Sequence, residues 1–297
     1  MERGFRPILN TDRIGSSVEI LLPGFPYRNK VVKEPCSIHY LEYGEGEPLL
    51  LVHSIGQSIY TWRNLMPLLA GRYRVIAFDL CGFGFSGRPD SMNYSMDEVA
   101  DAILWFMDAI QLQRTHLLGF SFGAVYALEA AVKAPERFAK KIALQPGGVT
   151  KQMPKKVRRM QKSVFGALVR ESYGKKHVQN LLRSCFYDAT AINRDIVGQY
   201  YETMDDFASR QAIMYSLRNF DLDESLKRAA AIADEVLVLW AAEDRLQPPE
   251  NMNLWKKSLR KGVYHTIRNA GHLMHEEKAE QLADIVDRYI QFQGENV

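Results

Sequence analysis

The sequence is poor in cysteine, with only Cys36, Cys81 and Cys185 in 297 residues. Three cysteines cannot all pair within one chain, and no two of these have the spacing of a metal site. The sequence therefore predicts reduced thiols and no structural metal. Because thiols stay reduced in the cytoplasm, a cytoplasmic location is the simplest interpretation.

Long apolar runs and a strong charge imbalance are also missing. No stretch approaches the roughly 18 apolar residues of a membrane span, so none is expected. The first residues have no apolar segment of signal-peptide length. The net charge is +3, which is too small an excess to indicate a nucleic-acid partner. What remains is ordinary globular composition, 46% hydrophobic and 25% charged.

Short apolar runs alternate with helix-favouring segments, and this indicates an α/β fold with a mostly parallel sheet covered by helices on both faces. The expected strands are Val18–Leu22, Ser37–Tyr43, Pro48–His53, Arg74–Asp79, Thr115–Leu118, Lys141–Leu144, Glu235–Ala241 and Val263–Ile267. The expected helices are Trp62–Leu69, which Pro67 should kink or end early, Met96–Ile110, which Ser95 should cap, Ala124–Ala131, Asn251–Leu259 and Ala279–Phe292.

The alternation stops between about Pro146 and Ala233, where the sequence favours several helices and no strong strand. We expect residues 1–146 and 234–297 to form the core domain and residues 147–233 to form an inserted helical cap. Such a cap should lie over the carboxyl edge of the sheet, where ligands bind in open α/β folds.

The segment Gly119-Phe120-Ser121-Phe122-Gly123 lies between an expected strand and an expected helix. That context is typical of a nucleophile elbow, a sharp turn that exposes a serine hydroxyl above the sheet. Side chains two residues before and two residues after the serine would collide in such a turn, which explains the two glycines. Ser121 is therefore the candidate nucleophile.

A serine hydroxyl needs a base, and the base needs an orienting carboxylate. His272 follows the last expected strand in a loop of small residues, so it is the candidate base, with His275 in reserve. Asp244 follows the strand Glu235–Ala241 and is the candidate acid, although the neighbouring Glu243 could serve instead. The other usual location of the acid, after Leu144, has no carboxylate.

Two backbone N–H groups should stabilise the negative charge that develops on the substrate oxygen. One should belong to Phe122, directly after the nucleophile, and the other to Ile55, in the loop His53-Ser54-Ile55-Gly56. His53 is expected to brace this loop rather than to act as a second base.

With these motifs the chain resembles the α/β-hydrolase fold family, from Ser37 to the last helix. The resemblance rests on the elbow, on His53–Gly56, on Asp79–Ser86, on the Asp244 loop and on Gly271-His272. It implies a Ser-Asp-His triad in that chain order and a structural role for the segment Asp79–Ser86. The family's first motif usually reads His-Gly, so Ser54 is a departure that could tilt the loop of Ile55.

The resemblance implies a serine hydrolase of the esterase or lipase type. We expect it to cleave a carboxylic ester of a fairly hydrophobic small molecule through an acyl-enzyme, with no metal or organic cofactor. Thioester hydrolysis, C–C bond hydrolysis and perhydrolysis by the same triad stay open. The alternative that is not an enzyme is a non-catalytic ligand receptor with this fold. Enzymes of similar fold that use an aspartate nucleophile carry it at the position of Ser121, so we do not expect that mechanism here.

The expected cap has two further features. Residues 151–183 carry one acid, Glu171, and ten basic residues: Lys151, Lys155, Lys156, Arg158, Arg159, Lys162, Arg170, Lys175, Lys176 and Arg183. This segment is either a solvated helical face or a docking patch for an anionic partner, such as coenzyme A phosphate, an acidic carrier protein or an anionic membrane surface. The cap is also rich in Met and aromatic residues, most of which should pack it onto the sheet. The oligomeric state is left open.

Overall fold

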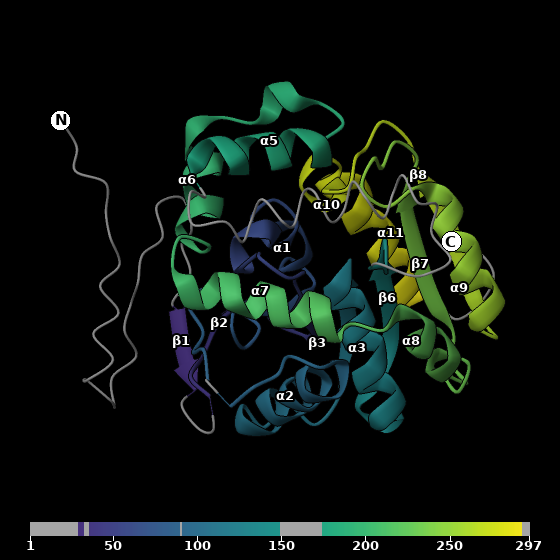
Figure 1. Ribbon diagram of the computed structural model, residues 1–297. Coiled ribbons are helices and arrows are strands. Elements are labelled where there is room, and N and C mark those ends of the chain that lie inside the picture. The colour runs from purple at the N-terminus through teal and green to yellow at the C-terminus, as the bar shows by residue number, and fades with distance from the viewer. Residues whose placement is uncertain (1–28, 33–35, 90, 149–173, 293–297) are drawn as a thin grey trace.

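The structure, a computed structural model, describes residues 29–32, 36–89, 91–148 and 174–292 (Figure 1). Its centre is an eight-stranded sheet in the order β1-β2-β4-β3-β5-β6-β7-β8. The strands are β1 (Asn29–Val32), β2 (Ile38–Tyr43), β3 (Glu47–Val52), β4 (Tyr73–Phe78), β5 (Thr115–Phe120), β6 (Phe138–Leu144), β7 (Val236–Ala241) and β8 (Gly262–Ile267). The expected strand Val18–Leu22 lies outside the described residues.

The sheet is mostly parallel, which confirms the predicted fold class. β2 pairs antiparallel with β1 and β4, and all other neighbouring strands run parallel. β5 and β7 are buried along their whole length. For β7 this burial explains a sequence that is one continuous apolar run. The loops that follow the parallel strands therefore gather at one edge of the sheet, where this fold class binds its ligands.

Helices cover both faces of the sheet (Figure 1). On one face α3 contacts α2 and α8, and α8 contacts α9; on the other, α1 packs against α11. The helices are α1 (Met66–Leu69), α2 (Met96–Ala109), α3 (Phe122–Lys133), α5 (Lys175–Cys185), α6 (Arg194–Glu202), α7 (Phe207–Asn219), α8 (Leu222–Ala229), α9 (Met252–Ser258), α10 (Met274–Glu277) and α11 (Ala279–Gln291), with 3₁₀ turns η1 (Ile59–Trp62), η2 (Pro135–Arg137), η3 (Ala189–Ala191) and η4 (Pro249–Asn251). Ser95 caps α2 as predicted, in a capping box with Glu98.

The prediction of one helix over Trp62–Leu69 is wrong, because the segment does not form a single helix. The segment instead forms η1, which ends at Trp62, and the separate helix α1, which begins at Met66. Pro67 lies in the first turn of α1, where a missing N–H costs no intrahelical hydrogen bond. The proline therefore begins a helix rather than kinking or ending one.

The described residues between β6 and β7 form helices and no strand, as the sequence predicts. α5 and α6 contact each other and lie above the carboxyl edge of the sheet (Figure 1). The end of α5 is tied to the loop after β8, because the Leu273 N–H donates to the Cys185 carbonyl oxygen at 3.3 Å. α8 instead packs on α3 and α9, beside the sheet. The division of the chain at residues 147 and 233 stays a prediction.

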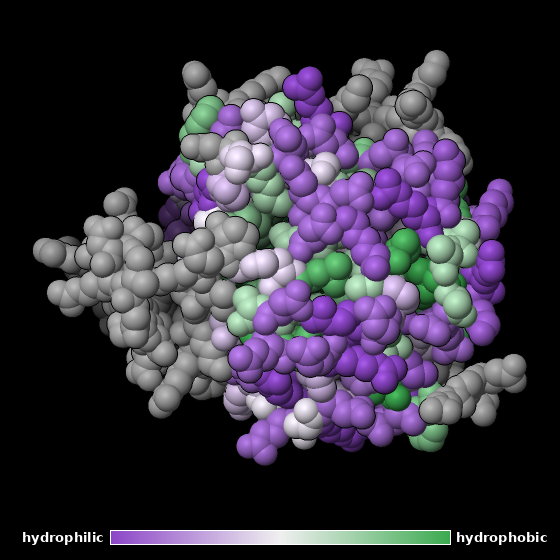
Figure 2. Space-filling view, turned by 90° about the horizontal axis from the view of Figure 1, so that it is seen from below, coloured by the Kyte–Doolittle hydropathy of each residue, from purple (hydrophilic) through white to green (hydrophobic). Residues whose placement is uncertain are grey.

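The end of the molecule opposite α5 is mostly hydrophilic, with small apolar areas among charged side chains (Figure 2). A hollow of about 320 Å³ lies at the amino ends of β6 and β7, far from the edge that carries Ser121. Lys141 lines it and is fully buried. Its ammonium group donates to the Asp234 carboxylate at 2.8 Å and to the Phe138 carbonyl oxygen at 3.0 Å, so the buried charge is compensated within the chain.

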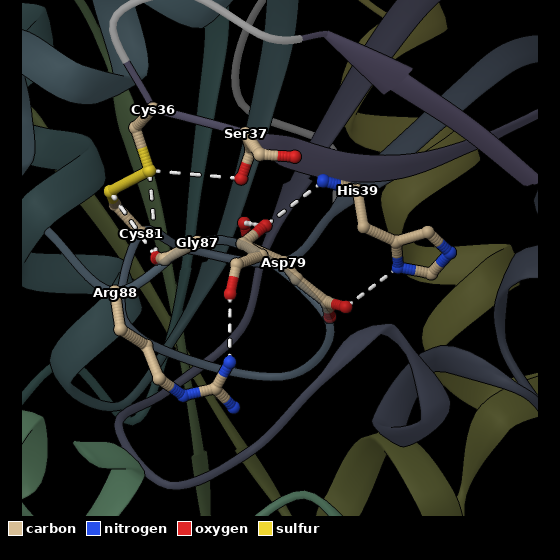
Figure 3. The surroundings of a disulfide bond; sticks show 8 residues. Cys36, Ser37, His39, Asp79, Cys81, Gly87 and Arg88 are labelled. Carbon is tan, nitrogen blue, oxygen red and sulfur yellow. Dashed lines mark hydrogen bonds and ion pairs between the residues drawn. A yellow bond between two sulfur atoms is a disulfide. The ribbon is translucent and has the colours of Figure 1, made fainter. Parts of the chain in front are cut away.

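Cys36 and Cys81 form a disulfide that joins the chain just before β2 to the loop after β4 (Figure 3). The prediction that all three thiols are reduced is therefore wrong, although Cys185 is free and buried. The two cysteines are 45 residues apart, and only the antiparallel pairing of β2 with β4 brings them together. Because disulfides persist mainly in oxidising compartments, the cysteine content no longer argues for the cytoplasm.

Candidate active site

Ser121 occupies a strained turn between β5 and α3. Its φ of 53° and ψ of −121° lie in a region that residues with a side chain rarely adopt. Its N–H donates to the Leu144 carbonyl oxygen of β6 at 2.8 Å, which helps to hold the turn in place. The sequence predicts this sharp turn from the two glycines around the serine, and the backbone has it.

The two elbow glycines are needed for close packing, but against different neighbours. A Cβ atom on Gly119 would lie 2.5 Å from Cα of Ala124, across the turn as predicted. A Cβ atom on Gly123 would instead lie 2.1 Å from the carbonyl oxygen of His53. Gly123 therefore allows the elbow to approach the loop after β3, which carries the expected oxyanion donor Ile55.

The structure brings Ser121, His272 and Asp244 together, although they come from three different loops. Nε2 of His272 lies 3.2 Å from Oγ of Ser121, and its Nδ1 lies 2.7 Å from Oδ2 of Asp244. All three side chains are buried. With a hydroxyl, an imidazole and a carboxylate in this spatial order, the serine proton can move to the histidine. The carboxylate then stabilises the resulting cation.

The Asp244 carboxylate is held by hydrogen bonds to both of its oxygens. Oδ1 accepts from the N–H groups of Leu246 and Gln247, each at 2.8 Å. Oδ2 accepts from Nε2 of Gln145 at 2.6 Å in addition to its contact with His272. Gln145 is a site residue that the sequence argument missed. The only signal for it was its place after Leu144, the other usual position of the acid in this fold.

The two reserve candidates have other partners. Glu243 accepts a hydrogen bond from the Ala270 N–H at 3.1 Å and so braces the loop that leads to His272. His275 lies in the short helix α10. Its Nε2 contacts Oγ1 of Thr61 at 2.6 Å. These contacts favour Asp244 and His272 for the predicted roles.

The two expected oxyanion donors, Ile55 and Phe122, line the same cavity as Ser121. The loop of Ile55 is closed by Gln57, whose N–H donates to the Ser54 carbonyl oxygen at 3.2 Å and whose Oε1 accepts from the Ser54 N–H at 3.1 Å. Ser54, the departure from the family pattern, thus takes part in a local turn. The roles of the Ile55 and Phe122 N–H groups stay predictions.

His53 braces this loop, as predicted. Its Nδ1 lies 2.7 Å from the Ser54 carbonyl oxygen, and its Nε2 accepts from the Leu80 N–H at 2.9 Å. One ring nitrogen must therefore carry a proton and the other must not, so the ring is neutral. Burial, partly offset by the charge of Asp79, lowers the pKa of His53 and keeps it so.

Asp79 is likewise structural. Its carboxylate accepts from the N–H groups of Ile59 at 2.7 Å and Phe85 at 2.8 Å and contacts Nδ1 of His39 at 2.7 Å (Figure 3 shows the last contact). Burial acts to raise the pKa of Asp79, but His39 and the hydrogen bonds lower it overall. The segment Asp79–Ser86 therefore holds two loops in place, as the family resemblance implies.

Acid is expected to destabilise the fold through His53 and His275. Burial lowers the pKa of both, and the charges of His272 and Arg63 lower that of His275 further. The unfolded chain takes up protons at these side chains near pH 6.5, whereas the folded chain does so only at lower pH. The free energy of unfolding should therefore fall as the pH drops below about 6.5, by about 1.4 kcal/mol per pH unit for each histidine.

Urea unfolding at several pH values between 7.5 and 5 measures this slope. A His275→Gln variant should lose about half of it, whereas replacement of the exposed His177 by glutamine should leave it unchanged. A free energy of unfolding that does not change between pH 6.5 and pH 5 would contradict the conclusion that folding lowers the pKa of both buried histidines.

A sequence profile described as "alpha/beta hydrolase fold" matches residues 47–279. This range includes β3 through β8 and the residues Ser121, Asp244 and His272. The chain belongs to the α/β-hydrolase fold family. It is therefore a hydrolase of this fold, as the sequence resemblance implies.

Two curated relatives and one solved structure resemble this hydrolase over most of their lengths. An uncharacterised hydrolase of Bacillus subtilis (strain 168) is 25% identical over 253 residues, covering 85% of this chain and 92% of that protein. A 2-hydroxy-6-oxo-6-phenylhexa-2,4-dienoate hydrolase of Comamonas testosteroni is 28% identical over 266 residues, covering 82% and 87%. The solved structure of a meta-cleavage product hydrolase from Pseudomonas fluorescens IP01 has a TM-score of 0.74 at 25% identity, covering 86% and 94%.

The cavity of the hydrolase beside Ser121 has a volume of about 70 Å³. Its described lining is mostly apolar and includes Val178, Leu181 and Leu182 of α5. Cys185 also lines it, but burial and the charge of Asp244 raise the pKa of this thiol to about 12. Cys185 is therefore a neutral thiol near neutral pH and a poor nucleophile.

The inserted helices are connected to the core by Tyr200 of α6. Its hydroxyl donates to the Glu276 carboxylate and also lies 3.1 Å from Oγ1 of Thr61. Tyr200 and Met204 also line the cavity. The expectation that most Met and aromatic residues of the cap are packed holds for these two, for Phe186 and for the half-buried Tyr201 and Tyr215, but Phe207, Met214 and Tyr187 are exposed. The remaining ones at 153, 160, 165 and 173 lie outside the described residues.

Most of the basic segment 151–183 also lies outside the described residues, so the expected anionic partner stays a prediction. No helix in the described ranges is long and apolar enough to cross a membrane. Among the residues that the structure describes, no group of three or more His, Cys, Asp and Glu side chains could hold a metal ion.

Proposed function

We propose that this hydrolase cleaves an acyl substrate through a covalent intermediate on Ser121. The observation that carries the proposal is the hydrogen-bonded series from Ser121 through His272 to Asp244, at 3.2 and 2.7 Å, on a strained elbow. Nε2 of His272 removes the hydroxyl proton as Oγ of Ser121 attacks the substrate carbonyl, and Asp244 stabilises the imidazolium that forms. The N–H groups of Phe122 and Ile55 bind the negative oxygen.

The intermediate then collapses towards an acyl-enzyme. The leaving group departs with the bonding electron pair and receives the proton held by His272. A water molecule, deprotonated by His272, next attacks the acyl group and regenerates the Ser121 hydroxyl. The products are a carboxylic acid and the protonated leaving group.

For the bond that is cleaved, the relatives favour a C–C bond next to a ketone. The Comamonas testosteroni relative is named for a dienoate that carries a 6-oxo group beside a phenyl ring, and the similar solved structure is a meta-cleavage product hydrolase. We therefore infer C–C bond hydrolysis as the first candidate and ester hydrolysis, the expectation from the sequence, as the second.

The cavity supports the ester candidate with one specific observation. A dienoate carries a carboxylate, and a buried carboxylate is usually paired with a cationic side chain. The described cavity lining contains no lysine or arginine, and its uncharged polar side chains besides Ser121 include Ser54, Gln57 and Gln247. An uncharged ester would need no such partner.

Incubation of the purified protein with 2-hydroxy-6-oxo-6-phenylhexa-2,4-dienoate and, separately, with p-nitrophenyl esters of short acyl chains distinguishes the two candidates. We expect loss of the dienoate chromophore, with benzoate and a hydroxypentadienoate as products, at a rate at least about 10-fold above that of any ester. Ester cleavage with untouched dienoate would favour the second candidate. Turnover of neither class by the folded protein would contradict both.

A further inference from the structure

Gln145 occupies a conformation that only its surroundings can enforce. It follows β6, is fully buried, and has a φ of 46°, in the left-handed region that glutamine seldom adopts. Its N–H donates to the Leu239 carbonyl oxygen of β7 at 2.8 Å. This backbone conformation places the side chain against Asp244, one strand away in the sheet.

The side-chain amide of Gln145 touches both loops that supply the base and the acid. Its Nε2 donates to Oδ2 of Asp244 at 2.6 Å and lies 3.4 Å from the carbonyl oxygen of Gly271, the residue before His272. Both partners only accept hydrogen bonds, so the NH₂ group must face them. One amide thus links the ends of β6, β7 and β8.

The contact with Asp244 is placed where it affects the base. Oδ2 is the same carboxylate oxygen that lies 2.7 Å from Nδ1 of His272. With the two N–H donors to Oδ1, the amide fixes the rotation of the carboxylate. The amide also stabilises the negative charge of Asp244 without adding a charge of its own. As a result, Asp244 stabilises the imidazolium of His272 less strongly.

We propose that Gln145 is a positioning residue of this hydrolase, one that sets the orientation and basicity of the Asp244–His272 pair. The inference rests on the proposed function, because it requires His272 to act as the base for Ser121. It also explains why an amide follows Leu144: a carboxylate at position 145 would place a second negative charge against Asp244 in a buried site.

Two variants separate positioning from structural support. In Gln145→Met the shape is kept and the hydrogen bond is lost. Its rate of reaction with a fluorophosphonate should fall about 10- to 100-fold, as for loss of a hydrogen bond to a charged group. The acid limb of its pH profile should move to higher pH, because Asp244 then stabilises the imidazolium more strongly. In Gln145→Glu the side chain can donate only when protonated, so the reaction should slow as rising pH ionises it.

Gln111→Glu is the matched control, because Gln111 also has a positive φ, 57°, but is exposed and precedes the amino end of β5, whereas Ser121 follows its carboxyl end. Its labelling rate and pH profile should equal those of the wild type. Folded Gln145 variants, as judged by circular dichroism, that label at the wild-type rate with the wild-type pH profile would overturn the positioning role alone. If Gln145→Met does not fold, the pH profile of Gln145→Glu decides. A wild-type protein that never labels would overturn the proposed function, and this role with it.

Discussion

Replacement of Ser121 by alanine is expected to lower the turnover number about 10³- to 10⁶-fold on any substrate that the wild type cleaves. The hydroxyl supplies the only nucleophile that the structure places 3.2 Å from Nε2 of His272 among the described residues. The backbone of the elbow should persist, because the Ser121 N–H and carbonyl oxygen make its hydrogen bonds to Leu144 and Ala124. Steady-state kinetics measure the turnover number of the variant, and a thermal unfolding curve of the same preparation shows whether its fold persists.

Ser91→Ala is a suitable control, since Ser91 is exposed in the loop before α2. It should keep the wild-type turnover number. Near-normal turnover in Ser121→Ala would refute the assignment of the nucleophile. Unfolding of that variant would instead show that the hydroxyl has a structural role that the hydrogen bonds of the site do not indicate.

Reduction of the disulfide between Cys36 and Cys81 is expected to lower the free energy of unfolding by about 2 to 4 kcal/mol. The bond closes a loop of 45 residues, and opening it returns conformational entropy to the unfolded chain. Urea unfolding with and without dithiothreitol, followed by tryptophan fluorescence, measures the difference. The double variant Cys36→Ser/Cys81→Ser should resemble the reduced wild type and should not respond to dithiothreitol.

The position of the disulfide adds a second expectation to this experiment. Cys81 follows Leu80, whose N–H donates to Nε2 of His53, and His53 in turn contacts the Ser54 carbonyl oxygen in the loop of Ile55. Reduction should therefore also loosen the predicted oxyanion loop and lower turnover modestly. An oxidised wild type whose unfolding midpoint does not move with dithiothreitol would contradict the stabilising role.

The core of the fold could be predicted from the sequence because buried parallel strands have an unmistakable composition. β7 is apolar throughout, and β3 and β4 are apolar over their last four residues. α2 is preceded by the capping serine Ser95, with a glutamate three residues later. The course of the chain around Pro67 could not, because a proline fits the first turn of a helix as well as it ends one. The partner of Cys36 depends on the pairing of β2 with β4, which no local spacing records.

The candidate site shows the same division. The elbow glycines and the positions of Asp244 and His272 after buried strands are local features, so the three residues could be named from the sequence. The contacts of Gln145 could not, because a glutamine after a strand has no local pattern that distinguishes it from a loop residue. Its relation to Asp244 depends on β6 and β7 being neighbours and on its own positive φ.

Covalent labelling tests the central claim most directly. The native protein should be treated with a fluorophosphonate, digested, and mapped by tandem mass spectrometry. We expect one adduct per chain on Oγ of Ser121, lost after heat denaturation and strongly reduced in His272→Ala. An adduct on another residue, or none on the folded protein, would contradict the account.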